Sequence, residues 1–99
     1  MYATFRKYRT SQAERLSRAV NEGFARNGAP AGLVAYYAID TGDDEWASFS
    51  IFETEEQARQ STADAAEWSR ENVAPLLEST PEITAGRLVV RQVPTAPEA

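Results

Sequence analysis

The fold is decided by residues 46–56, which read WASFSIFETEE. Residues 46–52 alternate with the period of two that is typical of a β-strand, and the acidic ETEE that follows is typical of a helix start. One face of this strand carries Phe49 and Ile51, as expected for a buried sheet face. The opposite face combines aromatic and hydroxyl side chains, which is unusual for a surface left in water; it carries Trp46, Ser48, Ser50 and Phe52.

Outward from this stretch, the same rules predict four strands and two helices. The strands are expected at residues 2–8, 33–40, 45–53 and 83–92. Capping boxes of the type Ser/Thr-x-x-Glu/Gln should begin both helices, at residues 11–14 and 54–57. The second helix is expected to end near Glu78, with a kink or break near Asn72, because Pro75 cannot continue the helical hydrogen bonds.

The order β-α-β-β-α-β predicts an α+β, ferredoxin-like fold, in which a four-stranded antiparallel sheet carries both helices on one face. The first helix offers the sheet an apolar stripe at helical spacing, with Leu16, Val20 and Phe24. The 99 residues suit a single domain, expected over residues 1–92, with residues 93–99 as an extended C-terminal tail.

Composition narrows the possible partners and chemistries. With 42% hydrophobic residues, 25% charged residues and a net charge of −5, the chain is an ordinary globular one. Its basic residues are scattered, so no nucleic-acid partner is expected. No membrane association is expected either, and the lack of a signal-like N-terminus favours a cytoplasmic location. The sequence has no Cys and no His, which argues against a metal or haem cofactor and leaves carboxylates, Tyr, Arg, Asn and Trp for any catalysis.

The two faces of the predicted sheet suggest self-association. The helix-covered face is assigned Phe5, Phe49, Ile51, Leu88 and Val90. The open face would then carry Tyr2, Arg6, Tyr8, Trp46, Ser48, Ser50, Phe52, Arg87 and Val89, with one of Tyr36 and Tyr37. Large exposed apolar patches are rare on monomers, so we expect a homodimer that forms through this open face and encloses a shared cavity.

Three segments carry a family resemblance that covers roughly residues 2–92. They are residues 31–33 (AGL), residues 49–58 (FSIFETEEQA) and residues 73–77 (VAPLL). In these segments and in its element order, the chain resembles the dimeric α/β-barrel superfamily, and within it the antibiotic-biosynthesis-monooxygenase-like domains. This resemblance implies that two ferredoxin-like subunits pair into an α/β barrel. Members include cofactor-free oxygenases of polyaromatic substrates, haem-degrading enzymes and many proteins without a known activity.

The resemblance also points to residues on the second helix. Similar oxygenases place a Trp on this helix, lining the cavity, with an Asn one turn earlier. Here Trp68 matches the Trp, Asp64 occupies the earlier position, and Asn72 is the nearest Asn, one turn after Trp68. Trp68 is therefore a candidate catalytic residue, with Asp64 and Asn72 as candidate substrate-binding residues; the alternative is that Trp68 is a core aromatic that covers the sheet.

Two arginines and a group of hydroxyl and aromatic side chains complete the candidate site. Arg87, assigned to a central strand that faces the cavity, could stabilise a developing enolate or phenolate as a catalytic residue; alternatively, it forms a salt bridge. Arg6 has the same two interpretations, and two arginines on one wall would favour an acidic ligand. The remaining candidates suit a flat, partly polar ligand or simply leave room for a partner subunit; they are Tyr36, Tyr37, Trp46, Ser48 and Ser50.

These residues leave three functions open. The first is a cofactor-independent monooxygenase that acts on a small aromatic metabolite, in which the substrate forms its own carbanion and reacts with O₂. The second is a non-catalytic module that binds a small ligand in the same cavity. The third is a structural dimeric domain with a filled interior. Haem degradation ranks below all three, because the chain has no His to bind iron.

Overall fold

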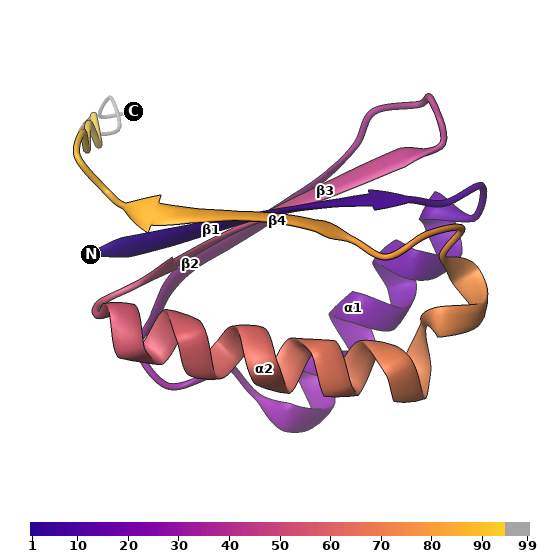
Figure 1. The fold of residues 1–99 in the computed structure, drawn as a ribbon, viewed down its shortest axis with the longest axis horizontal. Coiled ribbons are helices and arrows are strands. Elements are labelled where there is room, and N and C mark those ends of the chain that lie inside the picture. Colours follow the sequence, from indigo (N-terminus) through magenta and orange to yellow (C-terminus); the bar gives the residue numbers. More distant parts are fainter. Residues whose placement is uncertain (95–99) are drawn as a thin grey trace, which may run out of the picture.

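A computed structural model describes residues 1–94 and has the predicted order of elements (Figure 1). The elements are β1 (Tyr2–Arg9), α1 (Ala13–Asn27), β2 (Leu33–Asp40), β3 (Glu45–Phe52), α2 (Glu55–Asn72), the 3₁₀ turn η1 (Ala74–Leu76) and β4 (Glu82–Arg87). The strands form one antiparallel sheet in the order β2-β3-β1-β4. The predicted α+β, ferredoxin-like fold is confirmed. Of the predicted tail, residues 95–99 lie outside the described residues.

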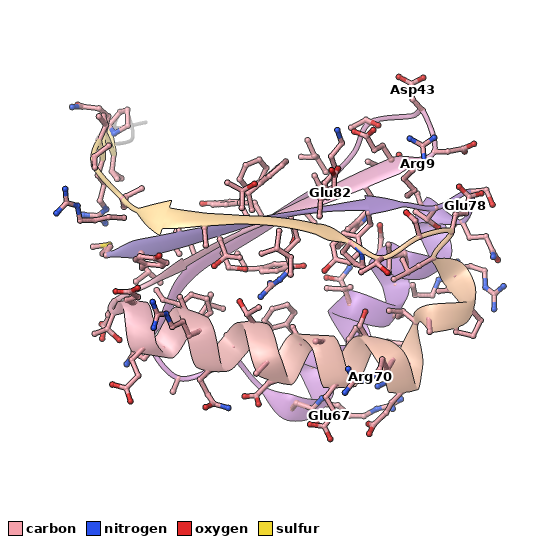
Figure 2. The ribbon with its side chains drawn as sticks, in the orientation of Figure 1. Arg9, Asp43, Glu67, Arg70, Glu78 and Glu82 are labelled. Carbon is pink, nitrogen blue, oxygen red and sulfur yellow. The ribbon has the colours of Figure 1, made fainter. Side chains whose placement is uncertain are left out.

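Both helices lie on the same side of the sheet, and no element of residues 1–94 covers its other face, which we call the uncovered face (Figure 1). Figure 2 shows Glu82 on the uncovered side of the sheet and Glu67 on the side of α2 that faces away from it. None of the helices in residues 1–94 is long and apolar enough to cross a membrane. The layer between helices and sheet is therefore the place where an internal site can form.

The assignment of the two sheet faces was wrong, and the faces are reversed. Trp46, Ser48, Ser50 and Phe52 are buried under the helices, whereas Phe49 is 40% exposed on the uncovered face. On β1, the buried residues Thr4 and Arg6 likewise face the helices. The error has a simple physical origin: a period of two separates the faces of a strand but does not say which face the helices cover. Both faces of this sheet carry large apolar side chains.

The last strand is shorter than predicted, since β4 ends at Arg87 and does not reach residue 92. Arg87 lies opposite Tyr2, where its partner strand β1 begins. One further backbone bond follows within residues 1–94, from Leu88 N to Met1 O at 2.9 Å. Beyond this point the described chain offers β4 no neighbouring strand. Val90, expected under the helices, is consequently outside the strand and exposed.

One of the two predicted capping boxes is present. At α2, Thr54 accepts a hydrogen bond from Gln57 N, and the Gln57 side chain accepts one from Thr54 N. The box at residues 11–14 is wrong, because α1 begins at Ala13 after Gln12. Thr10 is instead buried, and its hydroxyl donates to Leu76 O at 2.6 Å. The predicted break near Asn72 is present, since α2 ends there and Pro75 lies in the separate turn η1; the helix therefore does not continue to Glu78 as expected.

The hydrophobic core is centred on Trp46, which packs against Leu16 of α1 and Val73 after α2. The indole is 2% exposed, and its Nε1 donates to Ser17 Oγ at 2.8 Å. Ser17 in turn donates to Ala13 O, also at 2.8 Å. A polar atom of the buried indole is thus satisfied by α1, which fixes the helix against β3.

Replacing Ser17 with alanine should lower the free energy of unfolding by about 1–3 kcal/mol, because the buried indole N–H loses its acceptor. Urea unfolding followed by circular dichroism measures this change. Ser11→Ala, an exposed serine in the preceding loop, is the matched control and should change stability by less than about 0.5 kcal/mol. Equal stabilities for Ser17→Ala and the control would contradict this account of the core.

Candidate ligand-binding cavity

A cavity of about 300 Å³ lies between the helices and the sheet, and we call it the main cavity. Its walls come from the helix-covered face of β1, β2 and β3, from α1 and α2, and from the loop at residues 28–30. The lining residues with the largest or most polar side chains are Arg6, Tyr8, Leu16, Phe24, Leu33, Tyr36, Trp46, Phe52, Asp64 and Trp68. This volume falls at the lower end of the range for small-molecule sites.

Aromatic rings contribute to the wall from both helices and from the sheet. The rings of Phe24 on α1 and Tyr36 on β2 lie 4.8 Å apart, between their centroids. Trp68 lies directly against Gly23, where an added Cβ would come within 2.9 Å of the indole Cζ2. Glycine at position 23 therefore allows α1 to approach the Trp68 ring. The resulting walls are flat and apolar, which suits a planar ligand.

Small side chains keep the cavity open. On α2 they are Ser61, Ala65 and Ser69, which recur at the spacing of one helix face. On α1 and β3 they are Gly23 and Ser50. Protein interiors are close-packed, so a space of this size persists only where the surrounding side chains are too short to fill it. The face of β3 that carries Trp46, Ser50 and Phe52 therefore lines an internal cavity.

A polar cluster stands on the sheet beneath this space. Arg6 donates from Nη2 to Thr62 Oγ1 at 3.0 Å. Burial raises the pKa of Tyr8, against the opposing effects of the Arg6 charge and of the Ser48 hydroxyl. Burial likewise raises the pKa of Tyr36, and Ser48 again acts in the opposite direction. Both phenols are therefore neutral hydrogen-bond donors at neutral pH.

Ser48 lies opposite Arg6 in the β1–β3 ladder, and its buried hydroxyl is close enough to both phenols to lower the pKa of each. Within residues 1–94, however, no polar atom has the distance and angles of a hydrogen bond to Ser48 Oγ. The same is true of Thr4 Oγ1, two residues before Arg6 on the same face of β1. The floor of the site thus holds more buried polar groups than the described chain satisfies.

A second space of about 450 Å³, which we call the side cavity, lies between α2, β1 and β4. Arg6 and Tyr8 line both cavities from the sheet, and Ala65 and Ser69 line both from α2. The two cavities therefore meet at these four residues. The side cavity is also lined by the hydroxyl groups of Thr62, Ser79 and Thr80.

Six of the residues singled out from the sequence lie together around the main cavity: Arg6, Tyr36, Trp46, Ser50, Asp64 and Trp68. Asp64 is exposed at the rim, where its Oδ1 accepts a hydrogen bond from Gln60 Nε2 at 3.0 Å. Ser48 is buried beside this group without lining the cavity.

Three other predicted site residues lie away from the main cavity. Tyr37 is 66% exposed on the uncovered face of the sheet. Asn72 ends α2 with its Nδ2 bound to Trp68 O at 2.9 Å. Arg87 is exposed at the end of β4, and its assignment to a central strand was wrong, because β4 is an edge strand of the sheet. Its predicted catalytic role stays a prediction.

Sequence reasoning missed several residues of the cavity wall, notably Phe24, Leu33, Ser61 and Ser69. A signal for two of them was present, because Ser61, Ala65 and Ser69 share one helix face with Trp68. As for metals, no three acidic side chains in residues 1–94 lie close enough together to hold an ion.

This chain has the same fold as solved structures named as antibiotic biosynthesis monooxygenases. No protein-family model and no curated protein sequence matches the chain. The chain is similar to a solved structure of a protein of unknown function from Nitrosomonas europaea, with 24% identity, a TM-score of 0.77, and coverage of 96% of this chain and 95% of that one.

Two further solved structures carry functional names. One is a candidate antibiotic biosynthesis monooxygenase from Nitrosomonas europaea, with 14% identity, a TM-score of 0.73, and coverage of 91% of this chain and 100% of that one. The other is SnoaB, a cofactor-independent oxygenase from Streptomyces nogalater, with 13% identity, a TM-score of 0.64, and coverage of 93% and 94%. The resemblance predicted from the sequence is confirmed at the level of the fold.

The buried phenols predict a loss of stability in alkaline solution. Because the pKa values of Tyr8 and Tyr36 are raised in the folded state, the unfolded chain releases these protons first, from about pH 10. The free energy of unfolding should therefore fall as pH rises through that value and continue to fall up to the folded-state pKa values. Urea unfolding across this range measures the decline, which should be weaker in the double variant Tyr8→Phe, Tyr36→Phe. The same decline in both proteins would contradict the burial of these phenols.

Proposed function

We propose that this chain binds a small aromatic metabolite in the main cavity and oxidises it with molecular oxygen, without a metal or flavin. The observation that carries the proposal is the cavity itself: an internal space of about 300 Å³ with aromatic walls on three sides and a cluster of polar groups on the sheet. Its fold, shared with the cofactor-independent oxygenase SnoaB, supports the same choice.

The lining residues suit the binding step. Trp68 and Trp46 offer apolar ring surfaces for stacking, and Tyr8 and Tyr36 offer neutral phenol donors to orient a carbonyl or hydroxyl group. Arg6 supplies a positive charge close to both phenols. A charge in this position stabilises an enolate or phenolate as it develops on the ligand.

The proposed reaction needs no redox group from the protein. A CH₂ group flanked by aromatic rings loses a proton to give a delocalised carbanion, and O₂ adds to that carbon as a hydroperoxide. Loss of water then breaks the O–O bond and leaves a carbonyl group, so the carbon is oxidised and O₂ is reduced. The role of the protein is to hold the carbanion in an apolar space beside a positive charge, where both effects favour its formation.

A second function, ligand binding without turnover, is favoured by one observation. Asp64 is the single carboxylate among the residues that line the main cavity, and it is exposed and hydrogen-bonded to Gln60. The cavity therefore offers no buried carboxylate base to take the proton from a reluctant substrate. A structural domain with a filled interior is disfavoured by the cavity volume.

Oxygen consumption with hydroxy-anthrone substrates distinguishes the enzyme from the binder. We expect the wild-type protein to consume one O₂ per substrate, and Trp68→Phe to slow turnover about tenfold through loss of ring contact, equivalent to roughly 1.4 kcal/mol. Absence of turnover across a broad panel of phenolic substrates, with binding retained in Trp fluorescence titrations, would leave the binding function and reject the oxygenase.

The same assay tests the role of Arg87. Loss of turnover in Arg87→Gln would support the catalytic role that the sequence predicts for this residue. Unchanged turnover would reject it. Arg18→Gln is the matched control, because it removes the same charge from an exposed helix position that lies outside the main cavity.

We also propose that the chain forms a homodimer through the uncovered face of the sheet. That face carries Phe5, Phe49 and Ile51, which were expected on the helix-covered face. Its large side chains are Phe5, Tyr37, Ile39, Phe49 and Ile51. The rings of Phe5 and Phe49 lie 4.8 Å apart, and Tyr37, Ile39 and Phe49 are 66%, 49% and 40% exposed. An apolar sheet face of this kind favours burial against a second copy.

Light scattering over a concentration series tests the dimer. We expect twice the 10.9 kDa mass of the chain at micromolar concentration. Phe49→Glu should weaken association at least about a hundredfold, because it buries two like charges near the centre of the interface. Ala63→Glu, which adds the same charge to an exposed position on α2, should leave association unchanged. A wild-type mass of 10.9 kDa would contradict the proposal.

A further inference from the structure

Arg6 is a buried arginine that has no acidic partner among residues 1–94. It lies in the middle of β1 on the helix-covered face and is only 6% exposed. The ion pairs of the described chain involve other basic residues, namely Lys7, Arg9, Arg18 and Arg59. The one side-chain hydrogen bond of Arg6 in this part of the chain is that to Thr62 Oγ1.

A buried guanidinium without an acidic partner destabilises the folded chain unless an anion binds to it. Arginine keeps its charge inside proteins and has five N–H donors, of which Thr62 accepts one. Buried charges are normally paired with an opposite charge or bound to a ligand. An anionic group from outside the described chain is therefore the natural partner for the remaining donors.

The position of Arg6 indicates how that anion arrives. Arg6 and Tyr8 lie where the main cavity and the side cavity meet, across from Ala65 and Ser69 of α2. The main cavity on one side of this junction is lined mostly by apolar and aromatic side chains. A ligand whose anionic group reaches Arg6 can therefore place an apolar ring system in the main cavity.

The groups around Arg6 complete a site for an anionic oxygen atom. Arg6 and Tyr8 lie two residues apart on β1, and both line the main cavity together with Tyr36. Neutral phenols donate hydrogen bonds, as an anion requires. Ser48, opposite Arg6 in the ladder, stands near both phenols and can orient their hydroxyl groups.

We infer that Arg6 binds the anionic group of an acidic aromatic ligand, whose ring system occupies the main cavity and whose carboxylate or ionised hydroxyl lies at the junction with the side cavity. This inference rests on the proposed function, because it names the class of ligand for the same cavity. The site then selects by charge as well as by shape. A neutral aromatic compound of the same size leaves the guanidinium without a counter-charge.

Calorimetric titration with three matched probes tests the inference: naphthoate, its methyl ester and naphthol. The wild-type protein should bind naphthoate about ten- to a hundredfold more tightly than the ester, as expected for hydrogen bonds to a charged group. Arg6→Gln should remove this preference and leave the affinity for the ester within about twofold. Arg6→Lys, which keeps the charge, should retain part of the preference and serves if Arg6→Gln does not fold. Arg18→Gln should bind all three probes as the wild type does.

At a pH above the pKa of free naphthol, naphthol is ionised, and comparing its affinity with that of naphthoate shows which anion the site prefers. Tighter binding of either anion than of the ester supports the inference. Equal affinity of the wild type for naphthoate, ionised naphthol and the ester would overturn it and leave the proposed aromatic cavity in place. Survival of the preference in Arg6→Gln would also overturn it. Failure of all three probes to bind would instead contradict the proposed function, and the inference with it.

Discussion

The burial of a single indole, that of Trp46, determines how the helix layer meets the sheet. From β3, its ring packs against Leu16 of α1 and against Val73, the residue that follows α2. Its N–H donates a hydrogen bond to Ser17 Oγ on α1. This contact sets the distance between the layers at one place. Elsewhere, several of the facing side chains are small, so the same separation leaves a cavity. The same distance between the helices and the sheet therefore gives a packed core around Trp46 and an open cavity beside it.

The helix-covered side of the sheet carries an unusual number of polar groups for an interior. Two serines, a threonine, two phenols and a guanidinium without an acidic partner in residues 1–94 share it with Trp46 and Phe52. Well-packed apolar residues would stabilise a domain of this size more effectively, since an isolated buried charge is costly. Polar groups retained at such a cost are typical of sites that meet a ligand. The uncovered face, by contrast, exposes the large apolar side chains of Tyr37, Ile39 and Phe49, which is typical of an interface.

Local sequence signals predicted the elements well, whereas features that depend on distant partners were not predictable. The capping box at Thr54 and the break before Pro75 depend on neighbouring residues, and both are present. The side of the sheet that Trp46 faces depends on where α1 and α2 pack, which the alternation along β3 does not encode. The length of β4 depends on where β1 begins, and the placement of Arg87 depends on the strand order. The cavity could be predicted only as a list of side chains, because its shape arises from packing.

The most direct test of this account uses the two tryptophans, both of which line the main cavity. Their indole N–H groups give two resolved signals in a ¹H–¹⁵N spectrum of the labelled protein. Titration with naphthoate should shift both signals, and dilution through the range in which the protein dissociates should leave both in place. Signals that ignore the ligand and move on dilution would contradict the account, because they would place the tryptophans at the subunit interface.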